Sequence, residues 1–295
     1  MTIKIVLDSG SDIPSTWIDQ EIMKIVPLTV IDSNKGIEYK DYYDLSKEEL
    51  YKNMKEGTVY KTSQPSPESF YEVFKEEIEK GNIVLCLAMS SGISGTYQSA
   101  QIAYQKLKDE NNEDNVHIFD TKGASGGVSL IAVQLQKYIK QGHSLEDVKK
   151  YAEFLIDNLN SLFCAEDLVY LYRGGRISKA AKIVTGVLDI KPAMRINKEN
   201  GKLESYDKAR GETKVYKLLA KTMLEDSTKE ELQKQEIYVY HSYSLEKAEK
   251  IKNIIEKEIG ASNIFVSDIG CTIGAHTGPG TIAIFYLTKT GNFGA

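Results

Sequence analysis

The chain has 295 residues, of which 41% are apolar and 27% charged, so its composition is that of a folded protein long enough for two domains. The 37 basic and 42 acidic residues leave a net charge of -5, which argues against a nucleic-acid-binding protein. No apolar run approaches the roughly 18–20 residues of a membrane span, so we expect no stable membrane insertion. The three cysteines are odd in number and far apart, which predicts reduced thiols in a cytoplasmic protein, with no metal site and no cofactor.

The first 160 residues predict strands that alternate with helices. Apolar residues at helical spacing predict helices near residues 70–78 and 97–107, and a long helical stretch over 129–160 with a break near Gly142. Short runs rich in Ile, Val and Leu predict buried strands at residues 3–7, 25–31, 83–88 and 116–119. This alternation indicates a mostly parallel sheet flanked by helices on both faces.

The pattern changes near residue 160, where strands begin to outnumber helices. Only two long helices are expected there, over residues 212–224 and 244–259. Strands are expected at residues 186–190, 194–196, 203–206, 237–240, 264–266 and 281–287. We therefore predict an α/β protein of two domains, an N-terminal one over 1–160 and a C-terminal one over 161–295 with a mixed or antiparallel sheet. The groove between them is the expected ligand site.

An acidic turn, Asp8-Ser9-Gly10-Ser11-Asp12, follows the first expected strand. Such a turn can hold a metal ion or cap a helix, and the capped turn before Pro14 is the favoured interpretation. The aspartyl phosphotransferase pattern D-x-D-x-T is absent because Gly10 occupies its middle acidic position.

Two hydroxyl-rich segments precede expected helices. Thr62 and Ser63 come just before Pro65 and Pro67, where they can cap a helix or bind an anion. The segment Ser90-Ser91-Gly92-Ile93-Ser94-Gly95-Thr96 follows a buried strand and opens a helix, whose free N–H groups favour an anion. It matches neither the nucleophile elbow nor the phosphate-binding loop, since the elbow's second glycine and the loop's lysine are missing.

Two further motifs carry basic or imidazole side chains. Arg173 and Arg176 surround a glycine pair in an expected bendable loop, where they can bind a carboxylate or phosphate, or tie the domains together through carbonyl groups. His276 lies in Gly274-Ala275-His276-Thr277-Gly278-Pro279-Gly280, an expected loop between strands, which favours a ligand-binding role. The remaining histidines show no metal-binding spacing.

Taken together and in this order, the motifs resemble the DegV family from residue 1 to about residue 288. The resemblance is carried by four segments: Thr62-Ser63-Gln64-Pro65-Ser66-Pro67, residues 90–100, Arg173-Gly174-Gly175-Arg176-Ile177 and His276-Thr277-Gly278-Pro279-Gly280. One departure from the family pattern is Ala193 after Lys191-Pro192, where a larger aliphatic residue is usual, and it could alter the shape of a lipid tunnel.

The resemblance implies a DegV-like fold that holds one long-chain fatty acid. It also implies that the protein is the non-catalytic, fatty-acid-binding subunit of a fatty acid kinase, whose separate catalytic subunit phosphorylates the bound carboxylate to acyl phosphate. By motif, the residues expected at the carboxylate are Thr62, Ser63, Ser94, Gly95 and His276. Arg173 and Arg176 are expected to contact the partner or the phosphoryl group.

Two other functions remain open at this point. One is a stand-alone serine hydrolase or acyltransferase, with Ser94 or Ser91 as nucleophile, His276 as base, and Asp8 or Asp268 as the orienting acid. The other is a lipid carrier that has no kinase partner.

Overall fold

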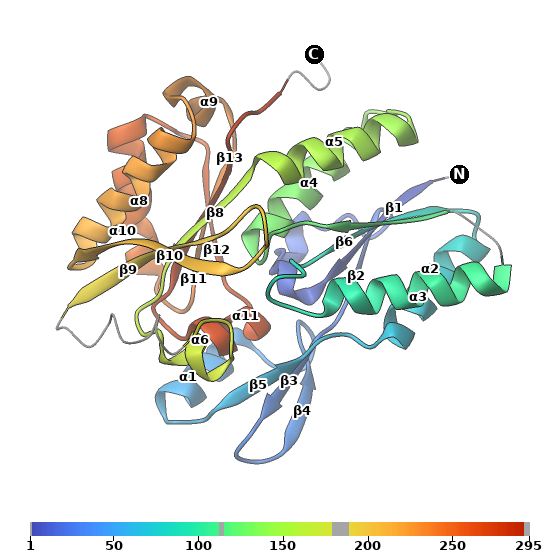
Figure 1. The fold of residues 1–295 in the computed structure, drawn as a ribbon, viewed down its shortest axis with the longest axis horizontal. Coiled ribbons are helices and arrows are strands. Elements are labelled where there is room, and N and C mark those ends of the chain that lie inside the picture. Colours follow the sequence, from blue (N-terminus) through green and yellow to red (C-terminus); the bar gives the residue numbers. More distant parts are fainter. Residues whose placement is uncertain (1, 112–114, 179–188, 292–295) are drawn as a thin grey trace.

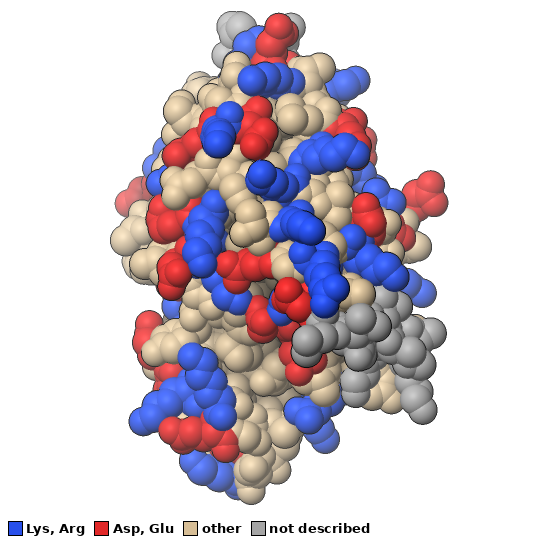
Figure 2. All heavy atoms as spheres, turned by 90° about the vertical axis from the view of Figure 1, so that its left-hand side faces the viewer, with Lys and Arg blue, Asp and Glu red and all other residues tan. Residues whose placement is uncertain are grey.

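The computed structural model describes residues 2–111, 115–178 and 189–291, which form three β-sheets and the helices that cover them (Figure 1). Within these residues no helix is long and apolar enough to cross a membrane. On the face that carries α8 (Glu212–Asp226) and α10 (Leu245–Ile259), basic and acidic side chains are interspersed (Figure 2). An example is Glu212, which pairs with Lys247 at 3.1 Å and with Lys250 at 3.3 Å.

The first sheet is parallel, as the sequence predicts, and its strands lie in the order β2-β1-β6-β7. Its strands are β1 (Ile3–Asp8), β2 (Met23–Val26), β6 (Ile83–Ala88) and β7 (Val116–Asp120). Every residue of β6 is buried, because helices lie on both faces of the sheet. One face packs against α2 (Pro67–Glu79) and α3 (Thr96–Asn111) through a cluster that includes Phe70 and Phe74.

The second sheet is mixed, in agreement with the prediction, and its order is β10-β9-β8-β13-β11-β12. Only the β11–β12 pair is parallel, and the other neighbours are antiparallel. Its strands are β8 (Leu159–Cys164), β9 (Ile190–Ile196), β10 (Leu203–Arg210), β11 (Ile237–His241), β12 (Ile264–Asp268) and β13 (Ile282–Leu287). The helices α8 and α10 cover one face, and α9 (Lys229–Lys234) lies beside α10.

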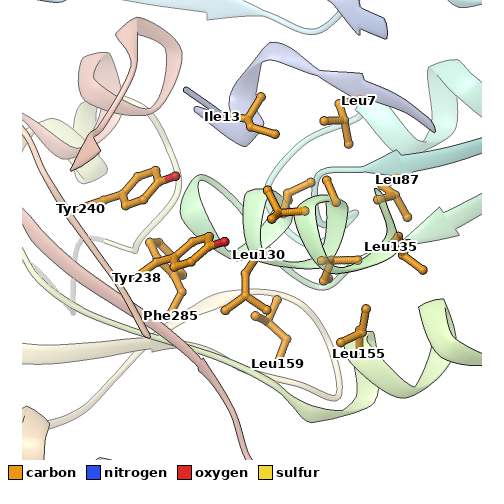
Figure 3. Packing of buried hydrophobic residues seen from close by; sticks show 14 of the residues in the cluster. Leu7, Ile13, Leu87, Leu130, Leu135, Leu155, Leu159, Tyr238, Tyr240 and Phe285 are labelled. Atoms are coloured by element: carbon orange, nitrogen blue, oxygen red, sulfur yellow. The ribbon is translucent and has the colours of Figure 1, made fainter. Parts of the chain in front are cut away.

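Helix α4 (Gly126–Lys140) lies between the two sheets and packs against both (Figure 3). Leu130 and Leu135 of α4 share one apolar cluster with Leu7 of the first sheet and Phe285 of the second. The helix ends at Lys140, and Gly142 follows two residues later with a φ of 84°, a conformation that favours glycine; α5 (Leu145–Asn158) comes next. The predicted break in the long helical stretch is therefore confirmed.

A third sheet, of antiparallel order β4-β3-β5, was not predicted. Its strands are β3 (Thr29–Asp32), β4 (Ile37–Lys40) and β5 (Tyr60–Ser63), and beside it lie α1 (Lys47–Lys55), α6 (Val169–Arg173) and α11 (Cys271–Thr277). The prediction of one strand over residues 25–31 was wrong. Pro27 separates β2 from β3, and because proline lacks an N–H the ladder ends there and the chain enters another sheet.

Two details of the second half differ from the expectation. Residues 186–188 of the predicted strand at 186–190 lie outside the described residues, and Ile190 belongs with Met194 to the single strand β9. Ala193 packs in the cluster under α8 and α10, on the face away from α4, so its small size does not shape the site described below. The predicted domain division at residues 160 and 161 falls inside β8 and stays a prediction.

Candidate functional site

The strands of the first sheet end at a cavity of about 290 Å³. Leu28, Met89 and Ala124 follow β2, β6 and β7 respectively, and all three line the cavity. Ligands of open parallel sheets bind at this carboxyl edge. The opposite wall comes from the second sheet, through Phe163 of β8 and Phe285 of β13. The volume lies at the lower end of the range for small-molecule sites, roughly 300–1,000 Å³.

One end of the cavity is polar, and a hydrogen bond between Thr62 and His276 defines it. Thr62 Oγ1 lies 2.6 Å from His276 Nε2, although 214 positions separate the two residues in the chain. β5 holds Thr62, and α11 holds His276. The structure thus brings together two of the residues that the sequence singled out, from different elements.

The prediction that His276 lies in a loop was wrong, because it lies near the end of α11. The glycines that indicated a loop have another purpose. A Cβ at Gly274 would lie 2.3 Å from the Tyr51 hydroxyl, so glycine lets the short helix pack directly against α1. Likewise, a Cβ at Gly174 would lie 2.2 Å from His276 Nδ1, so this glycine admits the imidazole ring.

His276 is held in its neutral form at pH 7. Burial, and secondarily the positive charge of Arg176, lower the pKa of the imidazole to about 4. A neutral imidazole can donate one hydrogen bond and accept one, so its pairing with Thr62 leaves one donor for an anion, either the Thr62 hydroxyl or the Nδ1–H group of the ring.

Ser94 also lines the cavity, just before α3. Its Oγ lies 2.8 Å from Thr96 Oγ1 and accepts a hydrogen bond from the Thr96 N–H at 3.2 Å. Gly95 is covered by Gln64, because a Cβ on Gly95 would lie 2.2 Å from Gln64 Oε1. Gln64 lines the cavity and donates to Ser99 Oγ at 3.0 Å, so it belongs to the polar end. Sequence reasoning missed it, although its place between Ser63 and Pro65 was a usable signal.

Ser63 lines the cavity with an exposed side chain, and its hydroxyl donates to the carbonyl oxygen of Gln64 at 3.4 Å. The two arginines differ in position. Arg176 lines the cavity and donates from Nε to the carbonyl oxygen of Ile93 at 3.1 Å, which ties the α6 region to the loop before α3. Arg173 is exposed and ends α6, so the expected loop is partly helical.

Arg173 borders a second recess, of about 560 Å³, which Lys61, Arg176, Thr62 and His276 also line. No acidic residue is among the described residues that line this recess. Thr62 and His276 therefore stand in the wall between the cavity and a cationic recess.

The acidic turn at residues 8–12 forms hydrogen bonds with residues that line the cavity. Asp8 accepts hydrogen bonds from the N–H groups of Gly10 at 3.0 Å and Met89 at 2.7 Å, and Ser125 donates to Asp12. Burial raises the pKa of Asp8 to about 6 and that of Asp12 well above its usual range. Met89 and Ser125 line the cavity, so this capped turn holds two of its wall residues.

The hydrolase arrangement is not assembled. His276 Nε2 is bonded to Thr62, while the Ser91 hydroxyl donates to Asp120 and that of Ser94 pairs with Thr96. The two candidate acids are engaged elsewhere, Asp8 with backbone N–H groups and Asp268 with Lys47 at 2.8 Å. A nucleophile, a base and an orienting acid need mutual hydrogen bonds, and the described residues form none of these links.

The fold and site define an α/β protein with a mostly apolar cavity that is lined at one end by hydroxyl, amide and imidazole groups. The model of the DegV family, described as uncharacterised, matches residues 2–289. A DegV domain-containing protein of Caldanaerobacter subterraneus subsp. tengcongensis is 32% identical over 97% of this chain and 99% of its own length. The chain belongs to the DegV family.

Solved structures of DegV proteins are also similar to this chain. A structure described as "Fatty Acid Binding of a DegV family Protein from Thermus thermophilus" has a TM-score of 0.86 and 31% identity, covering 97% of this chain and 99% of that one. DegV of Bacillus subtilis, described as a fatty acid binding protein, has a TM-score of 0.79 and 27% identity, covering 98% of this chain and 100% of its own.

Proposed function

We propose that this chain binds one long-chain fatty acid in the cavity between the two sheets, with the carboxylate at Thr62, Ser94 and His276. The observation that carries the proposal is the Thr62–His276 pair at the polar end of a mostly apolar cavity. The fatty-acid-binding relatives from Thermus thermophilus and Bacillus subtilis support it.

The binding free energy is expected to come mainly from the acyl chain, while the polar end binds the carboxylate. Each buried methylene contributes about 0.8 kcal/mol, so a chain of about 14 methylenes gains on the order of 10 kcal/mol before ordering costs. A buried carboxylate without partners would cost much of this gain. The hydroxyls and the neutral imidazole at the polar end remove that cost, and the arginine at the wall, Arg176, adds a positive charge.

We further propose that the protein presents the carboxylate to a separate fatty acid kinase catalytic subunit in the cytoplasm. A carboxylate oxygen attacks the γ-phosphorus of ATP, the new O–P bond gives an acyl phosphate, and ADP leaves with the broken bond's electrons. The chain has no phosphate-binding loop of its own, so ATP would come with the partner. The cationic recess bordered by Arg173 and Lys61 adjoins the carboxylate end and is the approach for the phosphoryl group.

The test has two stages. Protein purified from bacteria should carry a fatty acid in an organic extract analysed by mass spectrometry, and delipidated protein should bind oleate or palmitate. A protein that is empty and binds neither acid contradicts the proposal. Next, a fatty acid kinase catalytic subunit with ATP should form acyl phosphate only when this chain is present. Binding without phosphorylation would leave a lipid carrier, and reaction with a fluorophosphonate probe would favour a hydrolase.

A further inference from the structure

The cavity wall contributed by the second sheet carries one hydroxyl at a place surrounded by apolar groups. Alternation along β8 places Leu159, Ser161 and Phe163 on the same face, toward α4. Ser161 lines the cavity and is directly opposite Phe285 of β13 in the antiparallel pair. A Cβ built on Gly127 of α4 would approach the Ser161 hydroxyl to 3.2 Å, so the helix backbone also lies close.

The Ser161 hydroxyl has no hydrogen-bond partner among the residues that the structure describes, although its side chain is only 6% exposed. Other hydroxyls of the cavity wall are paired. Ser125 donates to Asp12, and Thr281 donates to the carbonyl oxygen of Thr277 at 2.9 Å. The Thr272 hydroxyl also lacks a partner in full hydrogen-bond geometry, but it faces the buried carboxyl of Asp41 and lowers the pKa of that group. For Ser161 the described residues show no such interaction, so an occupant of the cavity is a group that could pair with it.

Strand β13 indicates which part of a bound acyl chain would lie beside Ser161. Thr281 bonds to Thr277, the residue after His276, and is therefore near the polar end. Phe285 is four residues further on, which is about 13 Å in a strand. An acyl chain with its carboxylate at His276 that follows this strand passes Ser161 with its distal half.

We propose that the cavity accepts a long-chain fatty acid that carries a hydroxyl group in its distal half, with that hydroxyl paired to Ser161. The inference rests on the proposed function and adds a substrate class to it. A plain methylene chain would cover the Ser161 hydroxyl and leave it unpaired, whereas a chain hydroxyl both donates and accepts. Sites built around a buried hydrogen-bonding group discriminate strongly against ligands that lack the matching group.

The test is a cycle of two protein forms and two ligand types. Delipidated wild-type protein and Ser161→Ala are each titrated with octadecanoic acid and with monohydroxyoctadecanoic acids whose hydroxyl is moved stepwise along the distal half. In the wild type, one position should bind about tenfold more tightly than its neighbours. In Ser161→Ala this preference should disappear, while the plain acid binds at least as tightly as before.

Several outcomes overturn the proposal. One is a Ser161→Ala variant that keeps the same hydroxyl preference at every position, and another is a wild type that binds all hydroxy acids more weakly than the plain acid. A Ser161-dependent preference for cis-octadecenoic acids alone would assign the hydroxyl to a double bond and reject the hydroxy class. Binding of none of the acids rejects the proposed function itself.

Two controls keep the result interpretable. Ser205→Ala changes an exposed serine of β10 and should leave the preference intact. If Ser161→Ala unfolds, Ser161→Cys keeps the shape of the side chain with a slightly larger and more weakly hydrogen-bonding atom, and it should reduce the preference without abolishing binding. Thermal unfolding of each variant separates a loss of fold from a loss of selectivity.

Discussion

The two parts of the cavity wall differ in how they can contribute to binding. At the polar end, side chains already have partners in the protein, since Thr62 bonds to His276 and Arg176 to the Ile93 carbonyl. Along the wall formed by Phe163 and Phe285, contact is mostly apolar, with the Ser161 hydroxyl as its polar group. A directional end positions a ligand, whereas apolar area supplies most of the binding free energy. Changes to the wall should therefore weaken binding more than changes to the polar end.

The largest effect is expected from filling the wall. Ala283 of β13 is 6% exposed and lines the cavity, so Ala283→Phe should exclude several methylenes of the ligand. Excluding about four of them removes about 3 kcal/mol, a loss of more than a hundredfold in affinity. Equilibrium titration with a fluorescent fatty acid measures it.

The control for this variant is Ala209→Phe, on β10, which packs against the cluster on the other face of the second sheet. It should bind the fatty acid like the wild type. If Ala283→Phe is folded by circular dichroism and still binds with wild-type affinity, the acyl chain does not lie along β13. The claim that the apolar wall contributes more to affinity than the polar end is then contradicted.

A smaller effect concerns the protonation of the polar end. The pKa of His276 is about 4 in the folded protein, below the ordinary value of 6.5, so between these pH values the unfolded chain binds the extra proton. Stability from the neutral ring is therefore present above pH 6.5 and is lost as the pH falls toward 4, by about 2.5 kcal/mol between pH 7.5 and 4.5. Urea unfolding of wild type and His276→Gln at pH 7.5 and 4.5 measures this difference.

In His276→Gln the fall in stability between the two pH values should be smaller by that amount. His143→Gln, on the turn between α4 and α5, is the matched control and should keep the wild-type difference. The pKa of His276 should also rise when a fatty acid binds, because a carboxylate beside the ring favours its protonated form. An imidazole resonance that titrates near pH 4 with and without fatty acid contradicts a carboxylate at this position.

The smallest effect is expected from Thr62→Val, which keeps the shape of the side chain and removes its hydroxyl. The loss of one hydrogen bond to the carboxylate should weaken binding by about 1.5 kcal/mol, or about tenfold. Titration calorimetry with palmitate measures it, and Thr213→Val, at an exposed position of α8, is the control. A loss as large as that of Ala283→Phe would show that the polar end, not the wall, dominates affinity.

The sequence by itself determined the two kinds of sheet and most of the helices, because these depend on local periodicity and burial. The all-buried strand β6 and the break after α4 at Gly142 are examples. The motif residues Thr62, Ser94 and His276 were also visible in the sequence, since hydroxyls and imidazoles next to glycine and proline stand out.

Only the tertiary structure decided what those residues form. The bond from Thr62 to His276 spans 214 positions, and local spacing carries no information about such a contact. The pairing of β3 with β4 and β5, the helix around His276, and the cover of Gln64 over Gly95 likewise depend on which segments pack together. Only the packing around Ser161 shows that its hydroxyl is unpaired. The sequence of a strand does not tell whether the neighbours of a serine in space are polar.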